Sequence, residues 1–277
     1  MQIRVARHAG VCYGVERALE LAEEAAVRGG SVKTLGPLIH NPQAVAALKE
    51  RGVEVAVCLD EADEGTLVIR SHGVDPAIIE QARDKGLDVV DATCPFVSKA
   101  HDAARELKAA GYAVVIVGEA EHPEVEGIAA HASGDAIIVQ SPDELPERFS
   151  NRRVGVVVQT TQSADRLAAV VANLLPRVGE LRVFNTICSA TAKRQLSAEE
   201  LAREVDVMVV VGGHNSGNTS RLAEICARVN PQTHHVETAD ELDPAWFISA
   251  QSVGVTAGAS TPDAQMAGVI EAIESLT

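Results

Sequence analysis

Short apolar runs alternate with amphipathic stretches along the whole chain. Residues 32–35, 114–117 and 207–211 have the length of buried strands, and residues 15–28 and 97–110 repeat apolar side chains at helical spacing. Glycines close both of these helical stretches, as helix C-caps commonly do. Strands that alternate with helices predict an α/β protein with largely parallel sheets.

Three cysteines occupy matching places in this pattern, each where a strand-like run gives way to a helical one. Cys12, Cys94 and Cys188 are each followed by a glycine after 24 residues and by a polar residue after 28. The glycines are Gly36, Gly118 and Gly212, and the polar residues are His40, His122 and Ser216. The match predicts three similar small units, each with one thiol and one polar loop.

We expect the first α/β unit to span residues 13–94, the second 95–188 and the third 189–277. A strand within residues 1–8 is expected to complete the sheet of the third unit, because a strand precedes each of the other two cysteines. Three such units around a common axis would bring three thiolates together. Three thiolates suit an iron–sulfur cluster with one iron left open for chemistry.

The composition narrows the class of protein. Hydrophobic residues make up 46% of the chain and aromatic residues only 3%, so the core is expected to be mostly aliphatic. The formal net charge of −15 argues against a nucleic-acid partner and against adsorption to anionic membranes. No apolar signal segment or membrane-spanning run is visible in the sequence, so we expect a cytoplasmic protein with reduced cysteines.

Polar residues follow several predicted strands, at the edge where parallel α/β sheets bind ligands. Imidazoles, hydroxyls and free helix N-termini at this edge would bind a phosphate group without lysine or arginine. The same residues could instead be ordinary helix caps, and Glu124 a surface glutamate favoured by the helix dipole. The residues are His40, Asn41, Ser71, His72, His122, Glu124, Gln159, Thr160, Thr161, residues 215–218 and Ser260.

The other cysteines and four of the histidines are expected to have no chemical role. A single cysteine after a strand or on a helix is more often a small buried residue than a ligand, and we interpret Cys58 and Cys226 in this way. Three thiols at equivalent positions favour a shared metal centre instead. The histidines assigned to solvent or to helix caps are His101, His131, His234 and His235.

Short motifs in a fixed order cover nearly the whole chain. The motifs are GVCYGV (10–15), GPLIHN (36–41), RSHG (70–73), DATCP (91–95), HPE (122–124), QTTQ (159–162), IC (187–188), NSGNT (215–219) and GVTAGAS (254–260). In these motifs the chain resembles the 4-hydroxy-3-methylbut-2-enyl diphosphate reductase family, which acts last in the methylerythritol phosphate route to isoprenoids. Tyr13, His214 and Gly217 depart from common forms of the family, which place alanine, lysine and serine there.

The resemblance implies a trefoil of three α/β units around a central [4Fe-4S] cluster, with [3Fe-4S] as the form after exposure to air. Cys12, Cys94 and Cys188 would each bind one iron, and the fourth iron would bind the allylic oxygen of the substrate. The implied reaction is a two-electron reductive dehydroxylation that yields isopentenyl and dimethylallyl diphosphate. The implied protein partner is an electron donor of the ferredoxin or flavodoxin type.

The resemblance also implies roles for the polar residues at the strand ends. Glu124 matches the proton-delivering carboxylate, with Thr160 or Thr161 in its hydrogen-bond relay and His122 in the same catalytic group. The residues assigned to the substrate's diphosphate are His40, His72, His122, Thr160, Ser216, Gly217, Asn218 and Ser260.

Three alternatives use the same thiols differently. A redox-neutral hydro-lyase would use the open iron without consuming a reductant. A non-catalytic iron–sulfur redox protein would have a fourth cluster ligand and no use for Glu124. A protein with three buried thiols would bind no metal at all.

Overall fold

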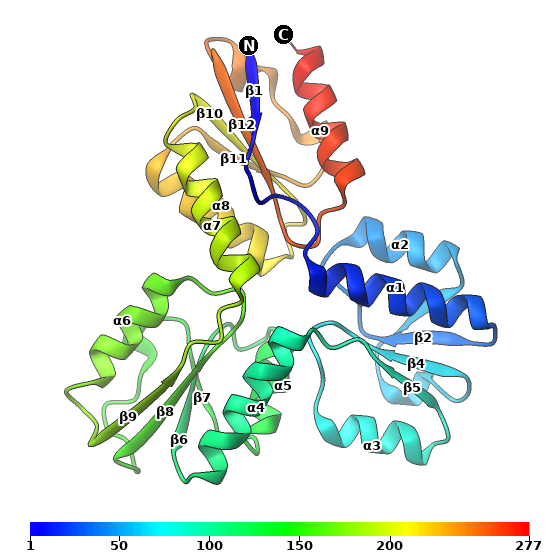
Figure 1. Cartoon of the computed structure of the whole chain (residues 1–277), viewed down its shortest axis with the longest axis vertical. Helices are drawn as coiled ribbons and strands as arrows, with labels where there is room; N and C mark the ends of the chain where they lie inside the picture. The colour runs from blue at the N-terminus through cyan, green and yellow to red at the C-terminus, as the bar shows by residue number, and fades with distance from the viewer. Residues whose placement is uncertain (277) are drawn as a thin grey trace. The chain divides into compact units, whose positions relative to one another are not determined.

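The structure, a computed structural model, describes residues 1–276 and contains three four-stranded parallel sheets (Figure 1). The chain divides into two compact units, which we call the central and the terminal unit. The central unit comprises Glu16–Ile39 and Val45–Cys188, and the terminal unit comprises Met1–Val15, His40–Ala44 and the chain from Ser189 onward. The predicted α/β class with parallel sheets is confirmed.

The first sheet of the central unit has the strand order β3-β2-β4-β5. Leu67 and Ile69 of β4 pack with Ala82 of α3, which holds that helix against one face of the sheet. The strands are β2 (Val32–Leu35), β3 (Val53–Ala56), β4 (Thr66–Ile69) and β5 (Asp88–Asp91), and the helices in this part of the sequence are α1 (Tyr13–Arg28), α2 (Pro42–Glu50) and α3 (Pro76–Asp84).

The second sheet of the central unit has the order β7-β6-β8-β9 and is buried on both faces. Ile116 packs with Leu107 of α4, and the next residue, Val117, packs with Val170 of α6 on the opposite face. Apolar runs without alternation are typical of parallel strands covered on both sides. The elements are β6 (Ala113–Val117), β7 (Ile137–Val139), β8 (Arg153–Val158), β9 (Glu180–Phe184), α4 (Pro95–Ala109), α5 (Pro123–His131) and α6 (Ala164–Leu174).

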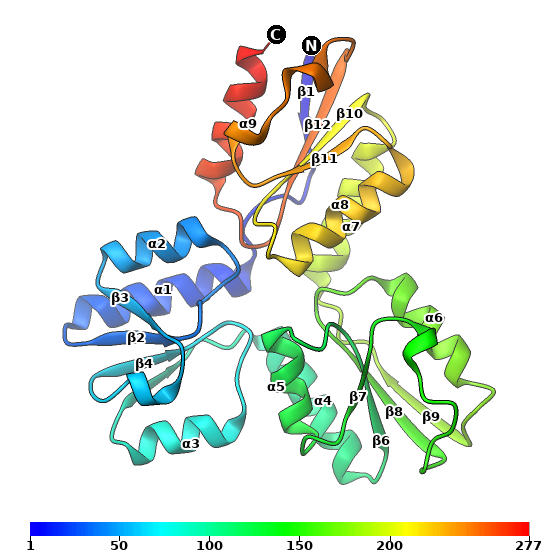
Figure 2. The same ribbon diagram turned by 180° about the vertical axis from the view of Figure 1, so that it is seen from behind.

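The sheet of the terminal unit has the order β1-β12-β10-β11. Val209 packs with Ile273 of α9, and Val210 packs with Leu222 of α8. The helices α8 and α9 therefore lie on opposite faces of this sheet (Figures 1 and 2). The N-terminal strand β1 pairs in parallel with β12. The elements are β1 (Gln2–Val5), β10 (Val207–Val211), β11 (Thr233–Val236), β12 (Ser252–Ala257), α7 (Ser189–Ala202), α8 (Gly217–Val229), α9 (Asp263–Ser275) and the 3₁₀ helix η4 (Pro244–Phe247).

The three sheets share one topology and one type of turn. Counted from β11, the third sheet runs β11-β10-β12-β1, which matches the other two with β1 in the last place. A short 3₁₀ helix follows the first strand of each sheet in this order, β3, β7 or β11; these helices are η1 (Leu59–Glu61), η2 (Pro142–Glu144) and η3 (Ala239–Glu241). In each turn the glutamate accepts a hydrogen bond from a backbone N–H four residues earlier: Glu61 from Val57, Glu144 from Gln140 and Glu241 from Glu237.

Each sheet draws its strands from one of the predicted segments, apart from β1, which joins the last. The boundaries themselves, at residues 94 and 188, stay a prediction. Among residues 1–276, no helix combines the length and the apolar composition that crossing a bilayer requires.

Gly155 of β8 lies against Leu107 of α4 without room for a side chain. An added Cβ would stand 2.4 Å from Leu107 Cδ2 and 2.9 Å from its Cγ, and Leu107 is fully buried. We expect Gly155→Ala to lower the free energy of unfolding by about 1–3 kcal/mol in urea denaturation. Gly268 of α9 has nothing within 4 Å of its Cβ position, so Gly268→Ala should raise that free energy by about 0.5–1 kcal/mol. Equal stability of the two variants would contradict this packing.

Candidate functional site

The three repeated cysteines occupy equivalent backbone positions. Each lies at the start of a helix, α1, α4 or α7, and is partly buried. Each backbone N–H donates to a carbonyl in the loop after the third strand of the same sheet: Cys12 to Ala259 (3.0 Å), Cys94 to Ser71 (2.9 Å) and Cys188 to Thr160 (3.1 Å). Because a helix N-terminus stabilises a thiolate, all three are suited to bind a metal.

The three repeated glycines are equivalent as well. The N–H groups of Gly36, Gly118 and Gly212 each donate to the last residue of the neighbouring edge strand, which is Ala56 (2.8 Å), Val139 (2.9 Å) and Val236 (2.9 Å). The chain therefore leaves each sheet at the same place. His40, His122 and Ser216 follow at the starts of α2, α5 and α8.

Glu124 is a buried carboxyl in the first turn of α5, only 2% exposed. Thr160, which follows β8, binds both of its oxygens. The backbone N–H donates to Oε1 (2.6 Å) and the hydroxyl donates to Oε2 (2.9 Å). Burial raises the pKa of Glu124 to about 7, although the two hydrogen bonds from Thr160 act to lower it. This carboxyl is divided between its acid and base forms near neutral pH, and the surface alternative is excluded.

Two histidines extend this cluster in the central unit. Nδ1 of His122 accepts a hydrogen bond from the backbone N–H of Glu124 (3.1 Å), so the neutral ring carries its proton on Nε2. The ring of His72, which follows β4, lies edge-on at 5.4 Å between centroids. Of the predicted residues, His72, His122, Glu124 and Thr160 are thus brought together, and Thr161 follows Thr160 in a partly buried position.

The start of α8 in the terminal unit combines a helix N-terminus with an unsatisfied amide. Ser216 caps the helix by accepting a hydrogen bond from Thr219 N–H (3.4 Å), as the cap alternative proposes. Asn218 is 6% exposed, and neither its Oδ1 nor its Nδ2 has a hydrogen-bond partner within the described protein. A buried amide without partners beside a helix N-terminus is suited to bind an anion. Gly217, the first residue of α8, offers only its backbone there.

Ser260 and His40 lie together in the same unit. The Ser260 hydroxyl donates to the backbone carbonyl of His40 (3.0 Å). The buried Asn41 accepts a hydrogen bond from the N–H of Ala44 (2.8 Å) and so fixes the start of α2. The segment 40–44 is therefore attached to the loop that follows β12.

Of the four histidines assigned to solvent or helix caps, His131 does end a helix: it is the last residue of α5, and its Nδ1 lies 2.8 Å from the carbonyl oxygen of Gly127. The other three differ from the expectation. His101 is buried in α4 and stacks on His131 with 4.1 Å between ring centroids, and burial lowers the pKa of His101 to about 4. His234 stacks on Trp246 at 3.8 Å, and His235 hydrogen-bonds to the carbonyl of Gly212 (2.9 Å). For His101, His234 and His235 the prediction was wrong because their contacts come from residues distant in sequence.

The two remaining cysteines, Cys58 and Cys226, differ in their exposure to solvent. Cys226 is fully buried on α8, as predicted. Cys58 is exposed, so its assignment to the core was wrong. It follows the edge strand β3, where an apolar run leaves the sheet and reaches the surface.

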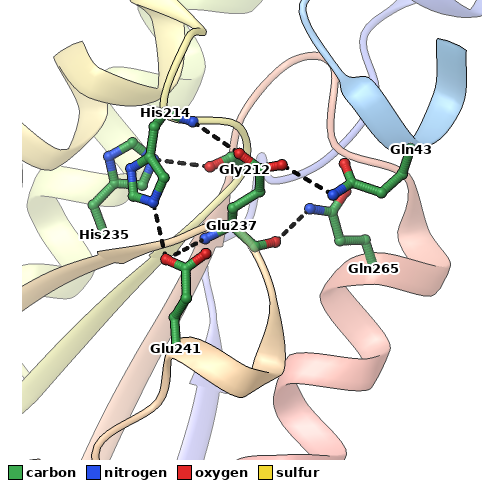
Figure 3. A network of polar contacts seen from close by, with 7 residues as sticks. All are labelled: Gln43, Gly212, His214, His235, Glu237, Glu241 and Gln265. Carbon is green, nitrogen blue, oxygen red and sulfur yellow. Dashed lines mark hydrogen bonds and ion pairs between the residues drawn. The ribbon is translucent and has the colours of Figure 1, made fainter. Parts of the chain in front are cut away.

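The sequence interpretation missed the polar residues that support the terminal unit's loops. Glu237, Gln43 and Gln265 form a hydrogen-bonded network with His214 (Figure 3). A signal was present, because Glu237 directly follows the strand β11.

Comparison with known proteins agrees with the resemblance seen in the motifs. Residues 3–274 match the family model described as LytB protein. The 4-hydroxy-3-methylbut-2-enyl diphosphate reductase of Geobacter metallireducens is 51% identical over 276 residues, which cover 100% of this chain and 98% of that protein. The enzyme of the same name from Pelobacter propionicus is 53% identical over 262 residues, covering 95% and 94%.

Solved structures similar to this chain belong to enzymes of the same kind. The structure titled (E)-4-hydroxy-3-methyl-but-2-enyl diphosphate reductase, the terminal enzyme of the non-mevalonate pathway, is 47% identical, covers 99% of each chain and has a TM-score of 0.74. The E-1-hydroxy-2-methyl-but-2-enyl-4-diphosphate reductase of Plasmodium falciparum is 26% identical, covers 98% of this chain and 87% of that one, and has a TM-score of 0.92. The motifs, the fold and the full-length match lead to one conclusion: this chain belongs to the LytB protein family.

Proposed function

We propose that this protein reduces 4-hydroxy-3-methylbut-2-enyl diphosphate to isopentenyl and dimethylallyl diphosphate. The reaction consumes two electrons and two protons, breaks the allylic carbon–oxygen bond and releases the hydroxyl as water. The observation that carries the proposal is Glu124, a fully enclosed carboxyl with a pKa of about 7 held by Thr160. The names of the similar enzymes support the choice of substrate.

The family implies an iron–sulfur cofactor, and the donor set fits one. Cys12, Cys94 and Cys188 have equivalent positions at helix starts, where thiolates are favoured. We propose that they hold a [4Fe-4S] cluster, or [3Fe-4S] after exposure to air, at the centre of a trefoil of three α/β units. Such a cluster would supply single electrons and a Lewis-acidic iron with an open coordination site.

The protein's own residues supply the proton. A backbone amide can only donate, so Glu124 Oε1 stays an acceptor for Thr160 N–H and the acidic proton resides on Oε2. The protonated carboxyl then donates to the Thr160 hydroxyl, whose own hydrogen turns toward the substrate. Thr160 thereby acts as a relay, with Thr161 next to it. Delivery of a proton lets water leave instead of hydroxide.

The diphosphate is held by neutral donors. Asn218, with its buried amide, and Ser216 and Gly217 at the start of α8 would bind its oxygens together with the helix N-terminus. His40, His72, His122 and Ser260, with Thr160, are assigned to the same group. Because the diphosphate is remote from the bond that breaks, its binding orients the allylic end.

The electrons come from outside the protein. We propose a small electron carrier of the ferredoxin or flavodoxin type as the partner, and the cytoplasm as the compartment. The acidic composition and the polar site give no role to a nucleic acid or a membrane surface.

The function is tested with anaerobically purified protein, the allylic alcohol diphosphate and a chemical reductant such as reduced viologen. We expect two electrons consumed per molecule of product, with both isomers separated by chromatography and then detected by mass spectrometry. Product formation without reductant consumption would instead establish a hydro-lyase. Reduction of the protein without any product would establish an electron carrier.

The pH dependence of turnover follows from the raised pKa of Glu124. The acid form is present below about pH 7, so kcat should fall as pH rises through that value. The hydroxyl of Thr160 lowers the pKa of Glu124, so Thr160→Val should move this fall to higher pH while reducing kcat. The measurement is kcat at saturating substrate from about pH 5.5 to about pH 9, a range that extends to both sides of the pKa of Glu124. An unchanged profile in Thr160→Val would contradict the assignment.

A further inference from the structure

Glu237, the residue after β11, is the centre of the polar network in Figure 3. Its Oε1 accepts a hydrogen bond from Gln43 Nε2 (2.9 Å), and its Oε2 accepts one from the backbone N–H of His214 (3.3 Å). Its backbone carbonyl accepts one from Gln265 Nε2. One residue thus joins the segment 40–44, the loop between β10 and α8, and the helix α9.

Each of these three parts of the terminal unit carries or adjoins a residue assigned to the diphosphate. His40 begins the first segment, and its carbonyl accepts the hydrogen bond of Ser260, which precedes α9. Asn41 Nδ2 donates to Gln265 Oε1 (3.0 Å), so the first segment is also attached to α9. Ser216 and Asn218 follow the His214 amide by a few residues.

Gly213 shows how closely these parts approach one another. A Cβ added there would stand 2.7 Å from Asn215 Oδ1, 3.4 Å from the carbonyl of His40 and 3.7 Å from Glu237 Oε2. A residue with a side chain would push the loop away from the other two. The arrangement therefore depends on a short, defined distance between Glu237 and the loop.

The turn that contains Glu237 does not need a carboxylate. Val57 and Gln140 occupy the same position in the equivalent turns, and both make the turn's hydrogen bond through the backbone N–H, as Glu237 does. The Glu237 side chain is therefore available for another role, and its two oxygens face the loops that hold the substrate.

We propose that Glu237 is a positioning residue of the diphosphate site. This proposal rests on the proposed function. Its carboxylate holds the loop of Ser216 and Asn218 and the segment of His40 at a fixed separation. The side chain itself does not touch the diphosphate. A positioning role and a purely electrostatic role predict opposite signs, because a nearby negative charge alone would weaken the binding of an anion.

The test compares Glu237→Gln with wild type and with the matched control Gln140→Ala, all as anaerobic holoprotein. A glutamine has one acceptor in place of two, so it loses either the Gln43 or the His214 hydrogen bond. We expect KM for the allylic diphosphate, and Kd for inorganic diphosphate by calorimetry, to rise about tenfold, the size of one lost hydrogen bond. Iron content and kcat should stay at wild-type values, the melting temperature should fall by only about 2–5 °C, and Gln140→Ala should change none of these quantities.

A double-mutant cycle with Gln43→Ala tests whether Glu237 acts on diphosphate binding through its hydrogen bond with Gln43. If Gln43 acts through Glu237, adding Gln43→Ala to Glu237→Ala, which has no side-chain acceptor, should not weaken the binding of inorganic diphosphate any further. A Kd that is unchanged or lower in Glu237→Gln would overturn the proposal, as would strictly additive effects. A wild-type protein that binds diphosphate but does not reduce the allylic substrate would overturn the proposed function and leave the binding comparison to decide the role of Glu237.

Discussion

Glu124→Gln should lower kcat by at least about a hundredfold while the bound cluster and the KM stay near wild-type values. The amide has the shape of the carboxyl. Its oxygen still accepts the Thr160 N–H, and its nitrogen can donate to the Thr160 hydroxyl, so the start of α5 keeps its structure. Only the acidic proton is lost. Anaerobic single-turnover kinetics measures the rate, and iron and sulfide assays measure the cluster.

The matched control for this variant is Glu126→Gln, on the same helix. The Glu126 side chain is 60% exposed and lies 3.8 Å from the Arg70 guanidinium, outside the hydrogen bonds of Glu124. We expect it to keep wild-type kcat. Wild-type turnover in Glu124→Gln would remove the proton-donor role, whatever the control does.

Replacing any one of Cys12, Cys94 or Cys188 with serine should reduce iron and sulfide content and lower turnover by at least about a hundredfold. The three positions are equivalent in the backbone, so the three variants should behave alike. Iron, sulfide and absorbance measured on anaerobically purified protein test this prediction. Full cluster content in any of the three variants would remove that cysteine from the ligand set.

Cys226→Ala and Cys58→Ala serve as controls for the ligand assignment. Burial raises the pKa of the Cys226 thiol to about 12, so it stays protonated within the α8 core. Cys58 is exposed at the edge of the first sheet. Both variants should keep wild-type iron content, since neither residue shares the backbone position of the three proposed ligands.

Local patterns were sufficient to predict most of the fold. The five apolar residues Val207–Val211 form the strand β10 as expected, since a buried parallel strand needs only a short continuous apolar run. The spacing between Cys12 and Gly36 reflects a repeated backbone position, and the structure shows it in the hydrogen bonds of both residues. The place of β1 in the sheet of the terminal unit followed from the repeat, although 250 residues separate Gln2 from its partner Ser252.

Contacts between distant segments could not be predicted in the same way. His101 lies within a helix whose periodicity was clear, yet its burial depends on His131 in a different helix. Glu237 looks like any polar residue after a strand, and its partners Gln43 and His214 are brought to it only by the tertiary fold. A sequence pattern identifies which residues end a strand, but not which loop lies opposite.

The pairing of β1 with β12 affects the order in which the protein can fold during synthesis. Gln2–Val5 are synthesised 250 residues before their partner strand, which begins at Ser252. The central unit, which ends at Cys188, is fully translated well before that point. A nascent chain therefore carries an unpaired β1 until Ser252–Ala257 have been synthesised, and the free backbone edge of this strand can pair with other chains during this interval.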